Sequence, residues 1–578
     1  MNHLHIDQVD DDGSAQPLLP RRISSPGPGL GWLDINSDGH DDLVIPSGRG
    51  GRLGVFLGNG RGGFQAMSAG AWSDIAAMGQ TAVMGWSPEP QAFLLWVGHA
   101  AFCGSAITNK ISRTHIWPGG IDPLPPIDGL LATLGALAAA DVEGDGDLDV
   151  FVGGRAVPGR YPESAPSILL MAEGHQWTQE PAASGAWQDM GLVTSAVWSD
   201  LDNDGTPELV VACEWGSVRV WKRERGQWME LTKSLGLDRF RGWWQSVSTG
   251  DFDGDGRLDI VAGNWGLNNK YHEFIEGGVR LVHGDVDSNG TYDVIEAVLD
   301  PRRGRVVPFR DRRTLSRAMP HLNGLFADYR GFAKAGLTDI LPAGSPAIPE
   351  LRVDTLASMV FLNRGGQFVP RVLPAEAQFS PAMGIAVADF DGDGREDLFV
   401  SQNFSALDPE TSREDAGRGL LLRGEGDGRF TPIRGQDSGL MIYGEQRGCA
   451  VADYDADGRP DLAVAQPGGP TRLFRNQAAR PGVRVRFDGP LGNVSSVGAK
   501  LRVAPSPDVP LGPAREIRAG SGCGSQDSVV QVVNFQGGVA RLWIQWPGGK
   551  VEEFSVPTNT AEVLVSPSKK PRFTPRSR

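Results

Sequence analysis

The chain has 578 residues, with 55 basic and 70 acidic side chains and a formal net charge of −15. Its 40% hydrophobic residues and 78 glycines are typical of a globular protein rich in turns, and its length exceeds what one hydrophobic core needs. The acidic residues gather in short clusters of fixed spacing, which indicates cation sites rather than nucleic acid as a partner, and no apolar run reaches the roughly 20 residues of a membrane helix.

Cysteine usage is sparse. The four cysteines lie far apart without a CxxC pair, so we expect buried or half-buried thiols and neither a disulfide framework nor a zinc site: Cys103, Cys213, Cys449 and Cys523.

Residues 1–25 are interpreted as an N-terminal extension. They show neither the basic n-region nor the apolar h-region of a secretory signal.

An acidic pattern, D-x-[DEN]-x-[DN]-G-x-x-[DE] followed by an apolar run, then recurs seven times. The copies start at Asp34, Asp141, Asp200, Asp251, Asp285, Asp389 and Asp453, at separations of 107, 59, 51, 34, 104 and 64 residues. A period of about 50–60 residues is typical of one four-stranded propeller blade per repeat. Residues 26–480 are therefore predicted to form an all-β propeller of seven or eight blades, and each long gap could hold a blade without an acidic loop or an insertion.

The spacing suits Ca²⁺, a hard cation that takes six to eight oxygen ligands at about 2.3–2.6 Å. Side chains at positions 1, 3, 5 and 9 of each acidic loop can converge with the backbone carbonyl of position 7, and the glycine at position 6 allows the sharp turn. Several Ca²⁺ ions, up to about seven, are expected, because Mg²⁺ prefers a stricter octahedron with retained waters. The predicted ligands are Asp34, Asn36, Asp38, His40 and Asp42; Asp141, Glu143, Asp145, Asp147 and Asp149; Asp200, Asp202, Asp204, Thr206 and Glu208; Asp251, Asp253, Asp255, Arg257 and Asp259; Asp285, Asp287, Asn289, Thr291 and Asp293; Asp389, Asp391, Asp393, Arg395 and Asp397; and Asp453, Asp455, Asp457, Arg459 and Asp461.

Two local motifs have alternative readings. The fifth copy carries Glu296 at position 12 and fits the EF-hand expression, but its flanks read as strands rather than helices, so an EF-hand is disfavoured. The run GNGRGG at 58–63 matches GxGxxG inside a predicted hairpin, which disfavours a dinucleotide site.

The gap after the fifth copy contains a helical pattern. Apolar residues recur at three- and four-residue intervals over 310–341, which predicts one or two amphipathic helices kinked at Pro320. Such an insertion would lie on a propeller face and could cap the central channel.

Beyond the seventh copy, residues 483–566 alternate apolar and polar positions and are predicted to form a small β-sandwich-like domain. Within it, residues 518–522 are interpreted as a turn between strands rather than a ligand loop. The basic tail, 567–578, is predicted to be disordered.

The acidic loops and the N-x-G-x-G-x-F turns resemble FG-GAP/VCBS repeats, the propeller blades also found in integrin α-subunits. The segment VGAKLRV…REIRAGSGCGSQDS…RLWIQWPGGKVEEF at 497–554 resembles the ASPIC/UnbV domain. Together they resemble the bacterial relatives of the cartilage acidic protein family. This resemblance implies an extracellular or cell-envelope setting, whereas the absence of a signal in this chain implies the cytoplasm if its start is genuine.

Three functions are weighed. The favoured one is a Ca²⁺-stabilised binding or adhesion module, a monomer whose loops contact a protein or glycan, since loops on a rigid scaffold suit recognition. The alternatives are an enzyme or a biosynthetic accessory protein using the mouth of the propeller channel. Against an enzyme stand the absence of HExxH, GxSxG and P-loop motifs and the engagement of most clustered carboxylates by metal.

Overall fold

The computed structural model describes residues 3–8, 11–24, 27–67, 72, 74–100, 109–118, 120–130, 134–174, 176–342, 348–506, 508–534 and 540–576. Among these residues the strands form ten small sheets, and no helix is longer than six residues. The same described residues include no helix long and apolar enough to cross a membrane.

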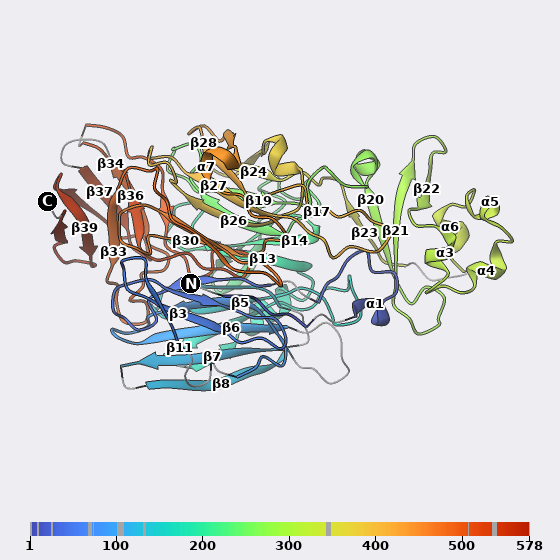
Figure 1. Ribbon diagram of the computed structural model, residues 1–578, viewed down its shortest axis with the longest axis horizontal. Helices are drawn as coiled ribbons and strands as arrows, with labels where there is room; N and C mark the ends of the chain where they lie inside the picture. Colours follow the sequence, from blue (N-terminus) through green and yellow to red (C-terminus); the bar gives the residue numbers. More distant parts are fainter. Residues whose placement is uncertain are drawn as a thin grey trace.

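Seven of the sheets are the blades of a propeller (Figure 1). The innermost strand of each blade contacts its two neighbours in the order β1, β5, β9, β13, β18, β26, β30 and back to β1, so the ring is closed with seven blades. The blades are β1 (Gly31–Leu33), β2 (Asp42–Ile45), β3 (Gly54–Gly58) and β4 (Phe64–Ala66); β5 (Gly79–Trp86), β6 (Phe93–Ala100), β7 (Asn109–Trp117) and β8 (Gly120–Leu130); β9 (Leu134–Ala140), β10 (Asp149–Gly154), β11 (Ile168–Glu173) and β12 (Gln176–Gln179); β13 (Leu192–Ser199), β14 (Glu208–Gly216), β15 (Arg219–Glu224) and β16 (Gln227–Glu230), with β17 (Gly242–Trp243) paired to β14; β18 (Ser246–Gly250), β19 (Asp259–Gly263), β24 (Met359–Asn363) and β25 (Phe368–Val372); β26 (Ala382–Ala388), β27 (Asp397–Gln402), β28 (Leu420–Gly424) and β29 (Phe430–Ile433); and β30 (Cys449–Ala452), β31 (Asp461–Val464) and β32 (Arg472–Phe474).

Apolar burial between adjacent blades explains the ring. Each of the seven blade–blade interfaces contains its own cluster of buried hydrophobic side chains, so every inner strand is apolar on both faces. Between the third and fourth blades, for example, Trp187, Trp198 and Trp228 pack together. A fully buried Val, Leu, Ile or Phe side chain in these clusters contributes about 1.5–3 kcal/mol. The predicted all-β propeller is confirmed.

The fifth acidic loop does not belong to the ring. The first long gap holds the second blade, which has no acidic loop, but the second long gap arises from an insertion inside the fifth blade, between β19 and β24. The interpretation of all seven copies as blade repeats is therefore wrong at Asp285, whose loop joins two strands of a separate inserted sheet.

That insertion combines a sheet with short helices. Its strands have the order β22-β21-β20-β23, and its α-helices are four residues long where one or two longer helices were predicted. Pro320, Gly324, Gly331 and Gly336 interrupt the apolar periodicity, which explains the short helices. The elements are η2 (His272–Gly277), β20 (Val279–Gly284), β21 (Asp293–Asp300), β22 (Arg305–Pro308), α3 (Arg312–Leu315), α4 (Leu322–Leu325), α5 (Tyr329–Phe332), α6 (Leu337–Ile340) and β23 (Glu350–Val353).

The N-terminal segment packs against this insertion. Leu18, Leu19 and Ile23 are buried in the same cluster as Leu281 and Leu315. The remaining short helices are α1 (Asp12–Ala15), α2 (Pro181–Ala186), η3 (Ala375–Gln378) and α7 (Gly435–Ser438).

Residues beyond the seventh blade form two four-stranded sheets around one apolar core, as the sandwich prediction requires. Their strands are β33 (Val483–Phe487), β34 (Lys500–Ala504), β35 (Arg515–Glu516), β36 (Gln531–Val533), β37 (Ala540–Gln545), β38 (Val551–Val556), β39 (Thr560–Val565) and β40 (Arg572–Pro575). The prediction of a disordered tail is wrong at β40, which pairs with β39. This domain and the insertion lie at opposite ends of the longest axis (Figure 1).

The loop between β35 and β36, residues 518–528, enters the propeller channel; we call it the plug loop. It bonds to the innermost strand of every blade. The contacts are Trp32 N–H to Gln526 O (3.0 Å), Val83 N–H to Gly524 O (3.0 Å), Ala139 N–H to Ala519 O (2.9 Å), Cys523 N–H to Ser195 Oγ (2.9 Å), Arg518 to Thr249 O (2.8 Å), Cys523 Sγ to Met383 O, and Ser528 N–H to Val451 O (2.9 Å). The interpretation of 518–522 as a simple turn therefore missed its packing role.

The plug loop and the N-terminal segment together close the channel. A cavity of about 40 Å³ separates Cys523 of the plug loop from Arg21, Arg155 and Arg447 at the opposite mouth. The insertion, expected to cap the channel, lies beside this mouth instead. As the structure stands, the space left holds only a few water molecules.

Candidate metal centres

All seven acidic loops share one backbone design. In every loop the glycine at position 6 has a φ between 82° and 98°, a conformation that side-chain-bearing residues rarely adopt. Its N–H donates to the aspartate at position 1, at 2.8–3.1 Å. The loop is thus wrapped around the first carboxylate.

The acid at position 9 begins the next strand and ties the loop to the sheet. In six loops it accepts the N–H of position 2. In five ring blades it also accepts an N–H from the third strand or from a residue within two positions of its end, as Asp397 does from Gly424 at 2.8 Å. Burial raises the pKa of this acid in all seven loops, to about 8 for Asp42, Asp259, Asp397 and Asp461 and to about 7 for Asp149, Glu208 and Asp293. A nearby cation would relieve this cost of holding a buried carboxylate.

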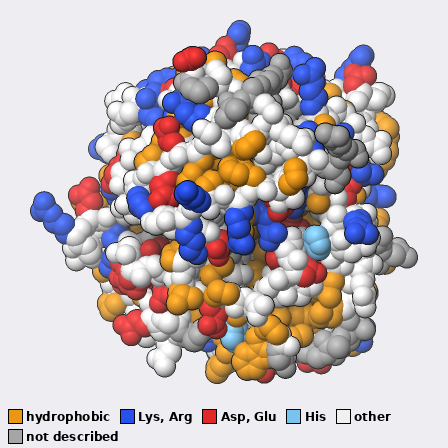
Figure 2. Space-filling model, turned by 90° about the vertical axis from the view of Figure 1, so that its left-hand side faces the viewer, with side chains coloured by type: hydrophobic (Ala, Val, Ile, Leu, Met, Phe, Trp, Pro, Cys, Tyr) orange, Lys and Arg blue, Asp and Glu red, His pale blue; other side chains and the backbone are white. Residues whose placement is uncertain are grey.

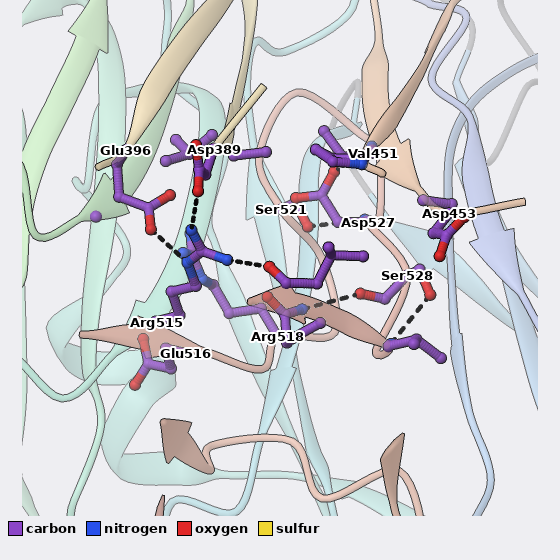
Figure 3. Close-up of a pocket in the computed structure, with 18 of the residues that line it drawn as sticks. Asp389, Glu396, Val451, Asp453, Arg515, Glu516, Arg518, Ser521, Asp527 and Ser528 are labelled. Atoms are coloured by element: carbon purple, nitrogen blue, oxygen red, sulfur yellow. Dashed lines mark hydrogen bonds and ion pairs between the residues drawn. The ribbon is translucent and has the colours of Figure 1, made fainter. Parts of the chain in front are cut away.

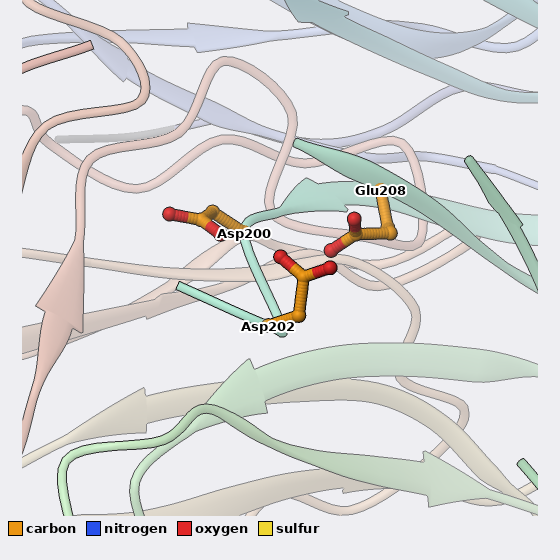
Figure 4. A group of neighbouring side chains, drawn as sticks. All are labelled: Asp200, Asp202 and Glu208. Carbon is orange, nitrogen blue, oxygen red and sulfur yellow. The ribbon is translucent and has the colours of Figure 1, made fainter. Parts of the chain in front are cut away.

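Five loops bring three acidic groups together, with ligand atoms within 4.8 Å of one another (Figure 4 shows the third loop). The groups are Asp200, Asp202 and Glu208; Asp251, Asp253 and Asp255; Asp285, Asp287 and Asp293; Asp389, Asp391 and Asp397; and Asp453, Asp455 and Asp461.

Several of these carboxylates keep a buried oxygen without a hydrogen-bond partner among the described residues. Such orphaned acceptors are costly unless something else satisfies them. They are Asp200 Oδ1 and Glu208 Oε1 in the third loop, Asp253 Oδ1 in the fourth, Asp287 Oδ1 and Asp293 Oδ1 in the fifth, and Asp455 Oδ1, Asp457 Oδ1 and Asp461 Oδ2 in the seventh. Of these, Glu208 Oε1 lies 2.9 Å from the ammonium of Lys222. Clustered, hard, partly unpaired oxygen donors fit Ca²⁺.

The first and second loops are looser. Position 3 is Asn36 in the first loop, and its side-chain oxygen accepts the N–H of Asp38 at 3.0 Å. In the second loop the position 3 acid, Glu143, faces Arg223 at 3.6 Å. Neither loop brings three acidic groups within 4.8 Å, so their predicted ligands share the backbone design without the same convergence.

The seven residues predicted to coordinate through their carbonyls occupy the expected turn. In six loops the N–H of position 7 donates to the side chain of position 5 at 2.7–2.9 Å, which fixes the turn. Coordination by the position 7 carbonyls stays a prediction.

The EF-hand reading of the fifth loop is excluded. The loop is flanked by β20 and β21, and Glu296 points to Arg310, at 2.8 Å, and to Tyr271 rather than into the loop. The hairpin reading of the glycine-rich run is likewise supported, since Gly58 ends β3 and Phe64 begins β4.

Basic side chains beside the loops were not predicted. Lys222 contacts the third loop, Arg364 lies 2.6 Å from Asp253, and Arg475 lies 3.0 Å from Asp457. Lys222 lies on the third strand of its loop's blade, and Arg364 and Arg475 directly follow the third strand of theirs, so only the pairing of that strand places them there.

The C-terminal domain supplies a second group of contacts, all to the aspartates at position 1. Arg484 lies 2.7 Å from Asp453 and Lys500 lies 2.8 Å from Asp200. The Ala514 N–H donates to Asp251 at 2.9 Å, and Asn534 donates to Asp389 at 3.1 Å. The domain therefore sits on the propeller face that carries the acidic loops.

The C-terminal domain and the propeller face that it contacts belong to parts of the chain with opposite net charge. Residues 483–578 contain 13 basic and 7 acidic side chains, whereas residues 1–482 contain 42 and 63. Basic side chains are spread over the domain's outer end as well (Figure 2).

The junction also encloses a polar cavity of about 60 Å³ (Figure 3). Arg515 points to Glu396 and Asp389, while Ser528 donates to Asp41 at 2.7 Å. Asp527 accepts the N–H of Val451 at 2.8 Å. Loops and plug are thus parts of one polar interface.

Comparison with known proteins agrees with these features. Residues 200–262 match the FG-GAP-like repeat, which confirms that resemblance. Cartilage acidic protein 1 of Xenopus tropicalis is 25% identical over 299 residues, 50% of this chain and 42% of that protein, and the Homo sapiens protein is 23% identical over the same length. The match thus spans less than half the length of these relatives. Saccharomyces cerevisiae Sqt1 covers 82% of this chain and 99% of its own at 11% identity, with a TM-score of 0.37.

Proposed function

We propose that the chain is a Ca²⁺-stabilised β-propeller interaction module. Bound Ca²⁺ stabilises the acidic loops of the blades and orders the propeller face that the C-terminal domain contacts. The observation that carries the proposal is the gathering of three acidic groups in five loops of one backbone design, several with orphaned buried oxygens. When bound, each Ca²⁺ would supply two positive charges to a loop with three or four carboxylates. The chain's own residues orient these carboxylates through the position 6 and position 2 N–H groups.

A binding role on the outer surface is supported by the closed channel. The plug loop and the N-terminal segment occupy the place that an enzyme active site at the channel mouth would need. The C-terminal domain lies at one end of the molecule and the insertion at the other (Figure 1). We assign partner binding to the end that carries the insertion.

At the other end a groove of about 550 Å³ runs between the fourth blade and the insertion. Its volume is typical of a small-ligand site. Trp215, Arg219, Asp238 and Arg241 line it, a mixture of one aromatic and several charged groups that suits a glycan or a polar peptide segment. We place the ligand there and expect a monomer in an extracellular or cell-envelope setting, where millimolar Ca²⁺ would fill even weak loops.

The metal claim is tested by elemental analysis. Purified protein is stripped with EGTA, passed into buffer with 1 mM Ca²⁺ or 1 mM Mg²⁺, and desalted. Several Ca²⁺ and little Mg²⁺ per chain are expected. A chain that retains no Ca²⁺ above a buffer blank contradicts the proposal.

The ligand claim is tested separately on an immobilised glycan panel. Arg241→Glu reverses a half-exposed charge in the groove, and Arg434→Glu, an exposed arginine of the sixth blade, is the matched control. Loss of a bound glycan in the first variant alone supports the groove; equal binding by both variants contradicts it.

A further inference from the structure

Lys222 occupies a position that no other ring blade fills with lysine. The β14–β15 register pairs Leu209 with Trp221, so the next residue along β15, Lys222, lies across from Glu208, the acid that closes the third loop. The same register places other residues across from the closing acids of the remaining ring loops: Leu57, Met171, Leu362, Arg423 and Arg475.

The Lys222 ammonium lies among the carboxylates of positions 3, 5 and 9. Nζ is 2.6 Å from Asp204 Oδ2 and 2.9 Å from Glu208 Oε1, and it donates to Asp202 as well. Asp202 and Glu208 belong to the cluster in Figure 4, so the ammonium stands among the oxygens that would surround a metal ion. Its side chain is only 9% exposed.

A second ammonium contacts the remaining acid of the third loop, Asp200 at position 1. Lys500 Nζ, from the C-terminal domain, lies 2.8 Å from Asp200 Oδ2 at position 1 and 2.7 Å from Asn203 Oδ1. The two lysines together carry the charge of one Ca²⁺ and face all four acids of the loop. Asp200 Oδ1 has no hydrogen-bond partner among the described residues, and Glu208 Oε1 has only its ion pair with Lys222.

The arginines beside other loops are placed differently. The side chains of Arg364 and Arg475 are 38% and 50% exposed and approach from outside. They leave Asp253 Oδ1 in one loop and Asp455, Asp457 and Asp461 oxygens in the other without hydrogen bonds. A planar guanidinium is an extended fork, whereas an ammonium is a compact charge with three donors that can replace a small cation.

We propose that Lys222 is the resident cation of the third loop, so that this loop takes no Ca²⁺ while neighbouring loops do. This inference rests on the proposed function, because it assumes that the other clusters bind Ca²⁺. It corrects the sequence expectation at Asp200, Asp202, Asp204, Thr206 and Glu208, and it makes the fourth blade the part of the ring whose loop is held without metal.

The test counts bound Ca²⁺ in Lys222→Met and in its matched control Lys233→Met, which removes an exposed lysine from the same blade. Methionine is chosen because Met171 occupies the equivalent place in the third blade. Lys222→Met is expected to hold one more Ca²⁺ per chain than the natural protein, and Lys233→Met the same number. An unchanged count in a folded Lys222→Met overturns the inference.

A measurement on the natural protein covers the case in which Lys222→Met does not fold. Hydrogen exchange is followed in peptides spanning 200–208, 251–259 and 453–461, with and without Ca²⁺. The last two are expected to gain protection on adding Ca²⁺, while 200–208 is equally protected in both conditions. A gain at 200–208 equal to the others overturns the inference, whereas no gain in any loop contradicts the proposed function itself.

Discussion

At the scale of single residues, each acidic loop balances carboxylate repulsion against backbone donors. Asp391 in the sixth loop is an example, since burial and the neighbouring Asp393 and Asp389 raise its pKa. Without metal, the unfavourable free energy of these clustered carboxylates lowers the stability of the fold. A bound cation would relieve the repulsion, and this relief contributes to the affinity for metal.

Asp391→Asn is therefore expected to affect the melting temperature differently in the presence and in the absence of Ca²⁺. In excess Ca²⁺ the variant should lose one bound ion and melt several degrees lower, because one ligand charge is gone. In metal-free buffer it should melt at the same temperature or slightly higher, because repulsion is relieved. Differential scanning calorimetry measures both.

Asp427→Asn is the control for that pair, because it removes an exposed carboxylate from the same blade, outside the loop. It should change stability by no more than about 0.5 kcal/mol in either condition. An Asp391→Asn variant that behaves like Asp427→Asn would show that the sixth loop is only a turn.

At the scale of elements, the sequence predicted the loops and the strands after them well, because the acidic pattern and the apolar runs are local. The sequence did not predict features that depend on strand register or on contacts between distant segments. Lys222 is recognisable only once β15 is paired with β14, and the fifth copy matches the repeat although its sheet is inserted within a blade. Nothing local in residues 518–528 indicates that they enter a channel formed by seven other segments.

The closing acids predict a pH dependence of the metal-free protein. Their folded-state pKa values of about 7 to 8 lie above the unfolded values of about 4, so the folded state binds more protons in this range. Stability without metal should therefore fall as the pH rises from about 4 to about 8.

Bound Ca²⁺ favours the charged form, so the difference in melting temperature between Ca²⁺-loaded and metal-free protein should widen from pH 5 to pH 8. Metal-free samples are prepared with a chelating resin, because EGTA binds Ca²⁺ poorly in acid. A difference that narrows over this range would argue against metal at the closing acids.

The plug loop offers a test of domain docking. Gly522 has a φ of 92°, and a Cβ there would collide with the carbonyl oxygen of Val247 on β18. Gly522→Ala should release the C-terminal domain and speed trypsin cleavage after Arg475, between blade and domain.

Gly548→Ala is the matched control. Its φ of 81° carries the same backbone strain, of order 1–3 kcal/mol, but a Cβ there meets nothing within 4 Å. If both variants are cleaved at the same rate, the plug does not hold the domain.

At the scale of the whole molecule, opposite charge and a shared polar interface join an acidic propeller to a basic domain. Acidic loops of the ring lie between them, and the position 1 carboxylates of four of these loops are bonded to the domain. Loss of metal should therefore weaken both the blades and the docking, and the molecule should respond as one unit.

The most direct measurement is calorimetric unfolding of the full chain with 1 mM Ca²⁺ and after metal removal. We predict a rise in melting temperature of 10 °C or more with Ca²⁺ and a single transition, since ions bound only to the folded state stabilise it by mass action. Identical melting temperatures in the two conditions would contradict a metal-pinned propeller and leave the acidic loops as hydrogen-bonded turns.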